Sequence, residues 1–383
     1  MGGKMTSRER VLAAIEHRPV DRMPMDLGMH GSTGISAFAY RKLRRYLGLE
    51  DRIPEIVDMV QFLARVEEDV MERLHLDCIV LSPRPKQMSV WRVRGEEEFL
   101  IPAAARPEQD ERGNWIVRSG PRRMRMPAGG YFFDGDWLDI KGFDQEELLT
   151  ATAKEARRIY EQTEYFTAYR SLYGFFKEND FDWQCRMLTE PETVIAEQER
   201  LLAAEIQRAG KIIELMGETV QAICIGGDLG SQTSTLVRPS VYQELCAPYL
   251  QRLCEFIHRN SDFKIFYHCC GAIEPLIGTL ADCGVDVLNP VQISARGMDP
   301  RLLKERYGDR ITFWGGGCDT QNVLPRADCR EVRRHVTELC SIFAPGEGFV
   351  FNQVHNIMAD IAPEKVAAVY DAAWEYGMAH ANA

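Results

Sequence analysis

The fold is decided by a stretch that reads Lys264-Ile265-Phe266-Tyr267-His268-Cys269-Cys270-Gly271. Its first half is short, apolar and rich in β-branched and aromatic residues, which predicts a buried strand over 264–267. A helical pattern follows at 274–283, and a second strand pattern comes next at 285–288. Strands that alternate with helices in this way pair in parallel, with the helices packed outside the sheet.

The same alternation extends in both directions along the chain. Further strands are predicted at 23–27, 78–81, 165–168, 222–225, 311–314 and 348–351. A first helix is capped by Thr6 or Ser7 and stops near Arg18-Pro19. Other helices are predicted at 191–216, 239–258, 300–307, 329–343 and 363–376. About eight strands in one domain favour an α/β fold of the (β/α)8 TIM barrel type over its alternative, a doubly wound open sheet.

One segment, residues 89–135, interrupts this rhythm. Val90-Trp91-Arg92-Val93 and Trp115-Ile116-Val117-Arg118 alternate like antiparallel strands, with a polar turn between them. We therefore expect a single domain over 1–383, with β-hairpins inserted at 89–135 after an early strand. Arginines in the insertion form a basic patch that suits a solvated loop face, or contact with a partner protein or an anionic cofactor: Arg118, Arg122, Arg123 and Arg125.

Composition excludes several classes of function. Hydrophobic residues make up 45% of the chain and charged residues 27%, as in a soluble globular protein. The net charge of −11 argues against binding to nucleic acids or to anionic membranes. No apolar run is long enough to span a bilayer, and the start lacks the apolar core of a signal peptide. The odd number of cysteines, 11, predicts reduced thiols in a cytoplasmic protein. The acidic surface suits a monomer and a homodimer equally.

Polar side chains and glycines gather where the predicted strands end. The carboxyl ends of parallel strands share one face of a barrel, and ligands bind there. Catalytic roles at this face are assigned to Asp228, Asn289 and Asp319. Asp228 is equally suited to be a general base, a substrate-binding carboxylate or a helix cap, and Asp319 to fix its loop. The amides at this face suit substrate hydrogen bonds or ties between loops: Gln292, Gln321 and Asn356.

His268 and Cys270 are the sharpest feature of this face. Residues two apart in a strand point the same way, so both face the barrel mouth while Cys269 faces the helices. An imidazole nitrogen and a thiolate suit zinc, and a catalytic zinc takes three protein ligands and keeps one open position. The predicted third ligand is His355, with Cys318 as the alternative. Without a third ligand, His268 and Cys270 would be ordinary core residues.

These motifs resemble the uroporphyrinogen decarboxylase superfamily. The resemblance covers nearly the whole chain and rests on residues 6–15, 17–24 and 284–292, on His268-x-Cys270-Gly271 and on residues 354–357. It implies a (β/α)8 barrel. Decarboxylases of the family carry an arginine-containing motif after the first strand and a catalytic Asp after the second. Here those places read Met25-Asp26-Leu27-Gly28-Met29-His30-Gly31 and Leu81-Ser82-Pro83-Arg84. Met25 and His30 are instead predicted substrate contacts.

The resemblance implies the other branch of the superfamily, the cobamide-dependent methyltransferases. These hold zinc on a His-x-Cys pair and a later Cys, and His355 stands in the region of that later Cys. The implied cofactors are Zn²⁺ and a cobalamin carried by a separate corrinoid protein, which docks partly on residues 89–135. The predicted activity is methyl transfer between that cobalamin and a methoxy compound or thiol. The alternatives are a lyase acting on a small carboxylic acid and a non-catalytic corrinoid- or tetrapyrrole-binding protein.

Overall fold

The computed structural model describes residues 4–95, 97–138, 140–173 and 180–381. Its centre is a parallel sheet of six strands in the order β14-β13-β12-β11-β10-β9. Their bounds agree closely with the predicted strands: β9 (Ala168–Tyr173), β10 (Ala222–Gly226), β11 (Lys264–His268), β12 (Val287–Asn289), β13 (Thr312–Trp314) and β14 (Phe349–Val350).

Two short segments close this sheet into a barrel. Met25 pairs in parallel with Phe351 beyond β14, and Cys78 pairs with Phe166 just before β9. The two segments join each other where the Asp77 N–H donates to the Met25 carbonyl at 2.7 Å. The six strands and these two segments surround one centre, which confirms the predicted (β/α)8 barrel.

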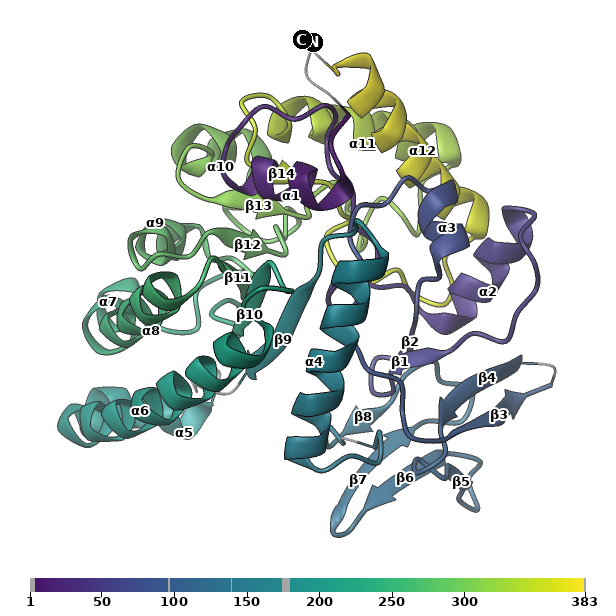
Figure 1. Cartoon of the computed structure of the whole chain (residues 1–383), viewed down its shortest axis with the longest axis horizontal. Helices are drawn as coiled ribbons and strands as arrows, with labels where there is room; N and C mark the ends of the chain where they lie inside the picture. Colours follow the sequence, from purple (N-terminus) through teal and green to yellow (C-terminus); the bar gives the residue numbers. More distant parts are fainter. Residues whose placement is uncertain (1–3, 96, 139, 174–179, 382–383) are drawn as a thin grey trace.

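Most helices lie outside the barrel (Figure 1). They are α2 (Ala37–Tyr46), α3 (Glu68–Arg73), α4 (Gln145–Gln162), α5 (Phe181–Thr189), α6 (Pro191–Met216), α7 (Pro239–Leu245), α8 (Ala247–Asn260), α9 (Glu274–Asp282), α10 (Pro300–Tyr307), α11 (Cys329–Phe343) and α12 (Pro363–Ala379). Helix α1 (Ser7–Ile15), capped by Thr6, instead packs Val11 and Ile15 into one cluster with the barrel interior. No helix within the described ranges is long and apolar enough to cross a membrane.

The single helix predicted over 239–258 is wrong, because the structure divides it into α7 and α8. The break falls at Cys246, whose φ of −120° and ψ of −48° leave the helical region. Pro248 lies in the first turn of α8. A proline has no N–H, and its ring clashes with the carbonyl four residues earlier, so α7 cannot continue through it.

The inserted region lies beside the carboxyl-end loops of the barrel (Figure 1). A hairpin of β3 (Met88–Arg94) and β4 (Glu97–Pro102) precedes a four-stranded antiparallel sheet: β5 (Glu108–Gln109), β6 (Trp115–Ser119), β7 (Arg122–Met126) and β8 (Asp134–Gly135). An earlier antiparallel pair, β1 (Ile56–Asp58) and β2 (Leu63–Ala64), lies in the loop that follows the first barrel segment. Leu100 N–H donates to Pro54 O, and Phe133 N–H to Val60 O, so the insertion is hydrogen-bonded to this loop.

Candidate metal centre

The end of β11 directs His268 into the barrel mouth. Phe266, two residues earlier, packs in the barrel interior with Cys224 and Trp314. Side chains alternate along a strand, so His268 faces the same interior. Cys269 is fully buried in the apolar core outside the barrel. This is the orientation that the alternation of residues predicts.

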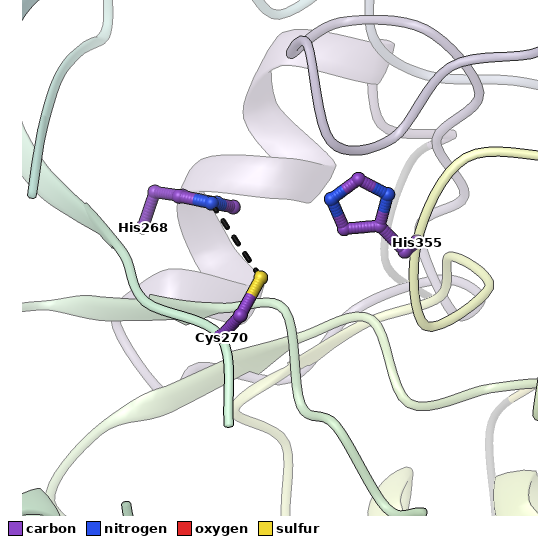
Figure 2. Close-up of side chains that lie close together, drawn as sticks. All are labelled: His268, Cys270 and His355. Carbon is purple, nitrogen blue, oxygen red and sulfur yellow. Dashed lines mark hydrogen bonds between the residues drawn. The ribbon is translucent and has the colours of Figure 1, made fainter. Parts of the chain in front are cut away.

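His355, from the loop after β14, joins His268 and Cys270 (Figure 2). The ligand atoms of these three residues all lie within 4.8 Å of one another, and Cys270 Sγ is 3.7 Å from His268 Nε2. Sulfur and nitrogen ligands of one tetrahedral zinc, at about 2.3 and 2.0 Å from the ion, are about 3.5 Å apart. The three residues therefore fit a zinc ion. Within the described ranges, no other group of His, Cys, Asp or Glu meets this distance criterion.

Asn289, at the end of β12, orients His268. Its Oδ1 lies 3.3 Å from His268 Nδ1 and accepts a hydrogen bond from Ser32 Oγ at 2.5 Å, while its Nδ2 donates to Trp314 O at 3.0 Å. A proton on Nδ1 leaves Nε2 as the acceptor on the side of Cys270. Such outer bonds fix the tautomer of a metal-binding imidazole. These contacts suit a positioning role for Asn289, and the catalytic role predicted for it stays a prediction.

Asp228 reaches the cluster because the loops after β10 and β11 touch backbone to backbone. A Cβ on Gly271 (φ +100°) would lie 2.3 Å from the Gly230 carbonyl carbon, so only glycine permits this approach. Asp228 Oδ1 accepts the Cys270 N–H at 2.9 Å and lies 3.8 Å from His268 Nε2. The carboxylate is 47% exposed and caps no helix, since α7 begins only at Pro239.

Burial sets the protonation of the three candidate ligands. It lowers the pKa of His355 to about 4, and the charge of His268 acts in the same direction. Burial also lowers the pKa of His268, which the nearby Asp228 and the bond to Asn289 partly offset. Burial raises the pKa of the Cys270 thiol, and Asp228 raises it further. At neutral pH the imidazoles are thus ready to bind a cation, whereas the thiol must first lose its proton.

His30 lies next to this cluster. Its ring centroid is 5.3 Å from that of His268 and 5.2 Å from that of Phe266. His30 Nδ1 is 2.7 Å from Ser32 Oγ, which donates to Asn289. Burial holds the pKa of His30 well below its ordinary value. The predicted substrate contact therefore belongs to a neutral hydrogen-bonded network that borders the metal ligands.

Cys318 and Asp319 fall outside the cluster. Cys318 is fully buried, its sulfur lies 4.0 Å from the Asp319 carbonyl, and it is not among the three grouped ligands. The Asp319 carboxylate accepts the N–H groups of Gln321 and Asn322 and the Asn322 side-chain amide. These contacts fix the loop after β13, which is the alternative role that the position of Asp319 suggested, and its catalytic role stays a prediction.

Gln292 and Gln321 also tie loops together. Gln292 Oε1 accepts the Gly271 N–H at 2.8 Å, and its Nε2 donates to Gln232 at 2.9 Å. Gln321 Oε1 accepts from Ser294 Oγ at 2.8 Å. Gln292 thus supports the backbone beside Cys270, whereas the bond of Gln321 to Ser294 joins the loops after β12 and β13.

Asn356 and Met25 contribute to the barrel frame. Asn356 bonds the loop after the first barrel segment through the Gly34 N–H at 2.7 Å and the Gly31 carbonyl at 2.8 Å. Met25 is fully buried in the outer apolar core, and its N–H donates to Asp77 at 2.9 Å. The side chain of Met25 points outward, away from the mouth. Met25 therefore does not suit the substrate contact predicted for it.

Sequence reasoning missed Arg170. The third strand was predicted to end at residue 168, but β9 continues through Tyr173. Ala168 packs in the barrel interior, so Arg170, two residues later, faces the same way. The side chain lies against Gly31, where a Cβ would be 2.6 Å from Arg170 Nη2. Extending the alternation from Ala168 would have placed this cation at the mouth.

Comparisons with known proteins agree with this architecture. The model of the family described as uroporphyrinogen decarboxylase (URO-D) matches residues 182–376, just over half of the chain and the part that holds all three candidate ligands. The chain belongs to the uroporphyrinogen decarboxylase family. A uroporphyrinogen decarboxylase from Thioalkalivibrio sulfidiphilus is 29% identical over 149 residues, which are 37% of this chain and 38% of that relative.

A solved methyltransferase from Methanosarcina mazei superposes with a TM-score of 0.60, covering 97% of this chain and 99% of its own. At 16% identity this likeness shows that the two proteins share a fold. The match to the Thioalkalivibrio protein spans little more than a third of that relative. Activity therefore has to be argued from the residues of the site.

Proposed function

We propose that this chain is a zinc-dependent methyltransferase that moves a methyl group between a small substrate and the cobalamin of a separate corrinoid protein. The observation that carries the proposal is the cluster of His268, Cys270 and His355, whose ligand atoms lie within 4.8 Å of one another at the barrel mouth. The fold shared with the Methanosarcina methyltransferase supports it. When bound, zinc supplies a Lewis acid that lowers the pKa of a thiol or stabilises a departing alkoxide or phenolate.

The chain's own residues prepare the site for such an ion. Asn289 holds Nδ1 of His268, so that Nε2 faces the neighbouring thiol. Asp228, which accepts the Cys270 N–H, places a negative charge beside the ligands. That carboxylate is half exposed and is therefore available to accept a proton from a substrate or from Cys270.

The charge of the ligand set favours a methoxy substrate over a thiol. Two neutral imidazoles and one thiolate leave a divalent cation with a net positive charge, whereas a second thiolate would cancel it. A positive site stabilises the negative charge that develops on a departing oxygen. Transfer of a methyl group from a methoxy compound to cobalamin is thus the direction that we favour, with the insertion at 89–135 forming part of the docking surface for the corrinoid protein.

Metal content is the first test. We expect close to one zinc per chain in protein purified with its thiols reduced, and loss of that zinc in Cys270→Ala and His355→Ala. Cys318→Ser is the matched control, because this buried cysteine lies outside the cluster and should keep the metal. Methyl transfer to reduced cobalamin, followed by the corrinoid absorbance, is the second test. Wild-type protein without stoichiometric metal would overturn the zinc mechanism.

Decarboxylation is a second candidate, favoured by the match to the Thioalkalivibrio decarboxylase. Such a lyase would release carbon dioxide from a small carboxylic acid with no methyl acceptor present. Its activity would also survive Cys270→Ala, which removes a metal ligand from the methyltransferase. An assay of carbon dioxide release by both proteins therefore separates the two reactions.

A further inference from the structure

Arg170 is shared between the barrel mouth and a large cavity. Its guanidinium lies against Gly31, the residue next to His30, whose ring is 5.3 Å from that of His268. Arg170 also lines a cavity of about 960 Å³ between the β1 loop, α4 and α6. Gly31 thus connects the two regions, because the guanidinium contacts this residue and the ring of its neighbour His30 lies beside that of His268.

The cavity combines polar and apolar walls. Its apolar lining includes Met59, Leu81, Ile140 and Leu149, and its charged lining consists of five cations, Arg170 among them, and three carboxylates. Sites for small molecules typically pair an apolar wall with a few polar groups that fix the orientation of the ligand. A small ligand with an apolar body and one charged end matches this lining.

The charge of Arg170 is less closely paired than that of Arg65, a second arginine of the same cavity. Arg65 bonds Glu55 at 2.8 Å, and this is the pair with which Arg170 is compared. The carboxylate nearest Arg170, that of Asp58, is 3.9 Å away, too far for a hydrogen bond. One oxygen of Asp58 already accepts two backbone N–H groups of its own turn. Among the residues that the structure describes, the fork of Arg170, with its side chain 27% exposed, thus lacks the close bidentate partner that a guanidinium prefers.

We propose that Arg170 binds a carboxylate on the methyl-carrying substrate, so that the substrates of this enzyme are methoxylated carboxylic acids. This inference rests on the proposed function, since it assigns the substrate class to the same site. A planar carboxylate fits the guanidinium fork with two parallel hydrogen bonds. The apolar body of the substrate then packs on the walls of the cavity, and its methoxy group reaches past Gly31 towards His30 and the metal ligands.

Binding measurements on the full-length, zinc-loaded protein test the inference without relying on turnover. The probes are 4-methoxybenzoate and its neutral counterpart 4-methoxybenzyl alcohol, titrated by calorimetry. We expect wild type to prefer the benzoate, and Arg170→Gln to lower the ratio of the two affinities about 10- to 100-fold, the range of a charge-assisted bidentate bond. Arg170→Lys should restore part of the ratio, because it keeps the charge but loses the fork.

Two further variants keep the test decisive. Asp58→Asn removes a competing carboxylate and should raise the affinity for the benzoate, an outcome that a purely structural Arg170–Asp58 pair would not give. Arg65→Gln is the matched control, since Arg65 lines the same cavity but is bonded to Glu55. The inference is overturned if wild type does not prefer the benzoate, or if Arg65→Gln lowers the ratio as much as Arg170→Gln.

The inference and the proposed function fail in different ways. Methyl transfer that is equally efficient with charged and neutral substrates would overturn the carboxylate site alone. Benzoate binding that depends on Arg170, in a protein without zinc or methyl transfer, would overturn the proposed function and leave the anion site in place.

Discussion

The two ends of the barrel differ in how completely their buried charges are paired. At the amino end, Asp77 is fully buried, and its carboxylate accepts bonds from both Arg10 and Arg22 at 2.6 to 2.8 Å. Ser7 Oγ and the Met25 N–H donate to the same carboxylate. The lone pairs of the Asp77 carboxylate oxygens are thus all used by hydrogen bonds within the protein.

At the carboxyl end, charges and metal-binding groups are held in place but left incompletely matched. Arg170 is 3.9 Å from Asp58, and His268 Nε2 is 3.8 Å from Asp228. Asn289 fixes one nitrogen of His268 and leaves the other directed at Cys270. Closed networks at one end therefore stabilise the fold, while the open ones at the other end suit the ion and the substrate that we propose. Substitutions at each end test whether stability depends on the amino end and metal binding on the carboxyl end.

Cys270→Ala should have the largest effect, and it should fall on activity. Removing a zinc ligand forfeits several kcal/mol of transition-state stabilisation, which corresponds to a loss of about 1000-fold or more in methyl transfer. The metal-free protein should change little in stability, because a partly exposed thiol contributes little packing. Urea unfolding of metal-free wild type and variant measures the second point. A large loss of metal-free stability would mean that the mouth, too, is built for the fold.

Asp77→Ala is the counterpart at the amino end. It leaves Arg10 and Arg22 largely buried without their shared carboxylate, and breaking a buried pair in this way costs roughly 3–5 kcal/mol of unfolding free energy. Zinc content per folded chain should stay at the wild-type value. Urea unfolding and metal analysis on the same preparation report both quantities. A variant of normal stability that loses zinc would contradict the division between the two ends.

Asn289→Ala tests the hydrogen bond that orients His268 within the mouth. Loss of an outer hydrogen bond to a metal-binding histidine lowers metal affinity about 10- to 100-fold. Competition with a chromophoric chelator measures this affinity. Gln321→Ala is the control, because Gln321 ties the loops after β12 and β13 through Ser294 and lies in neither of the loops that carry the three ligands. Equal losses in both variants would show general loosening of the mouth.

The sequence predicted what depends on local pattern. Period-two alternation placed His268 and Cys270 on one side of a strand, and position at a strand end singled out His355. The sequence did not predict that Asn289 orients His268, because that role depends on Ser32, 257 residues away in the chain. Arg170 was missed because its strand extends beyond the apolar run that marked it. The break between α7 and α8 was missed although Pro248 signals it.

The pH dependence of zinc binding gives the smallest and most specific prediction. The pKa of His355 is lowered to about 4 and that of His268 is lowered from its ordinary value near 6.5, so both imidazoles are mostly neutral between about pH 7 and 8. The pKa of Cys270 is raised, so its thiol keeps its proton over this range until the ion binds. Binding should therefore release one proton, and affinity should rise about tenfold per pH unit. Calorimetry in buffers of different ionisation enthalpy counts this proton. A count near three would show that the histidines are charged before zinc binds, and a count near zero that the thiol is already ionised.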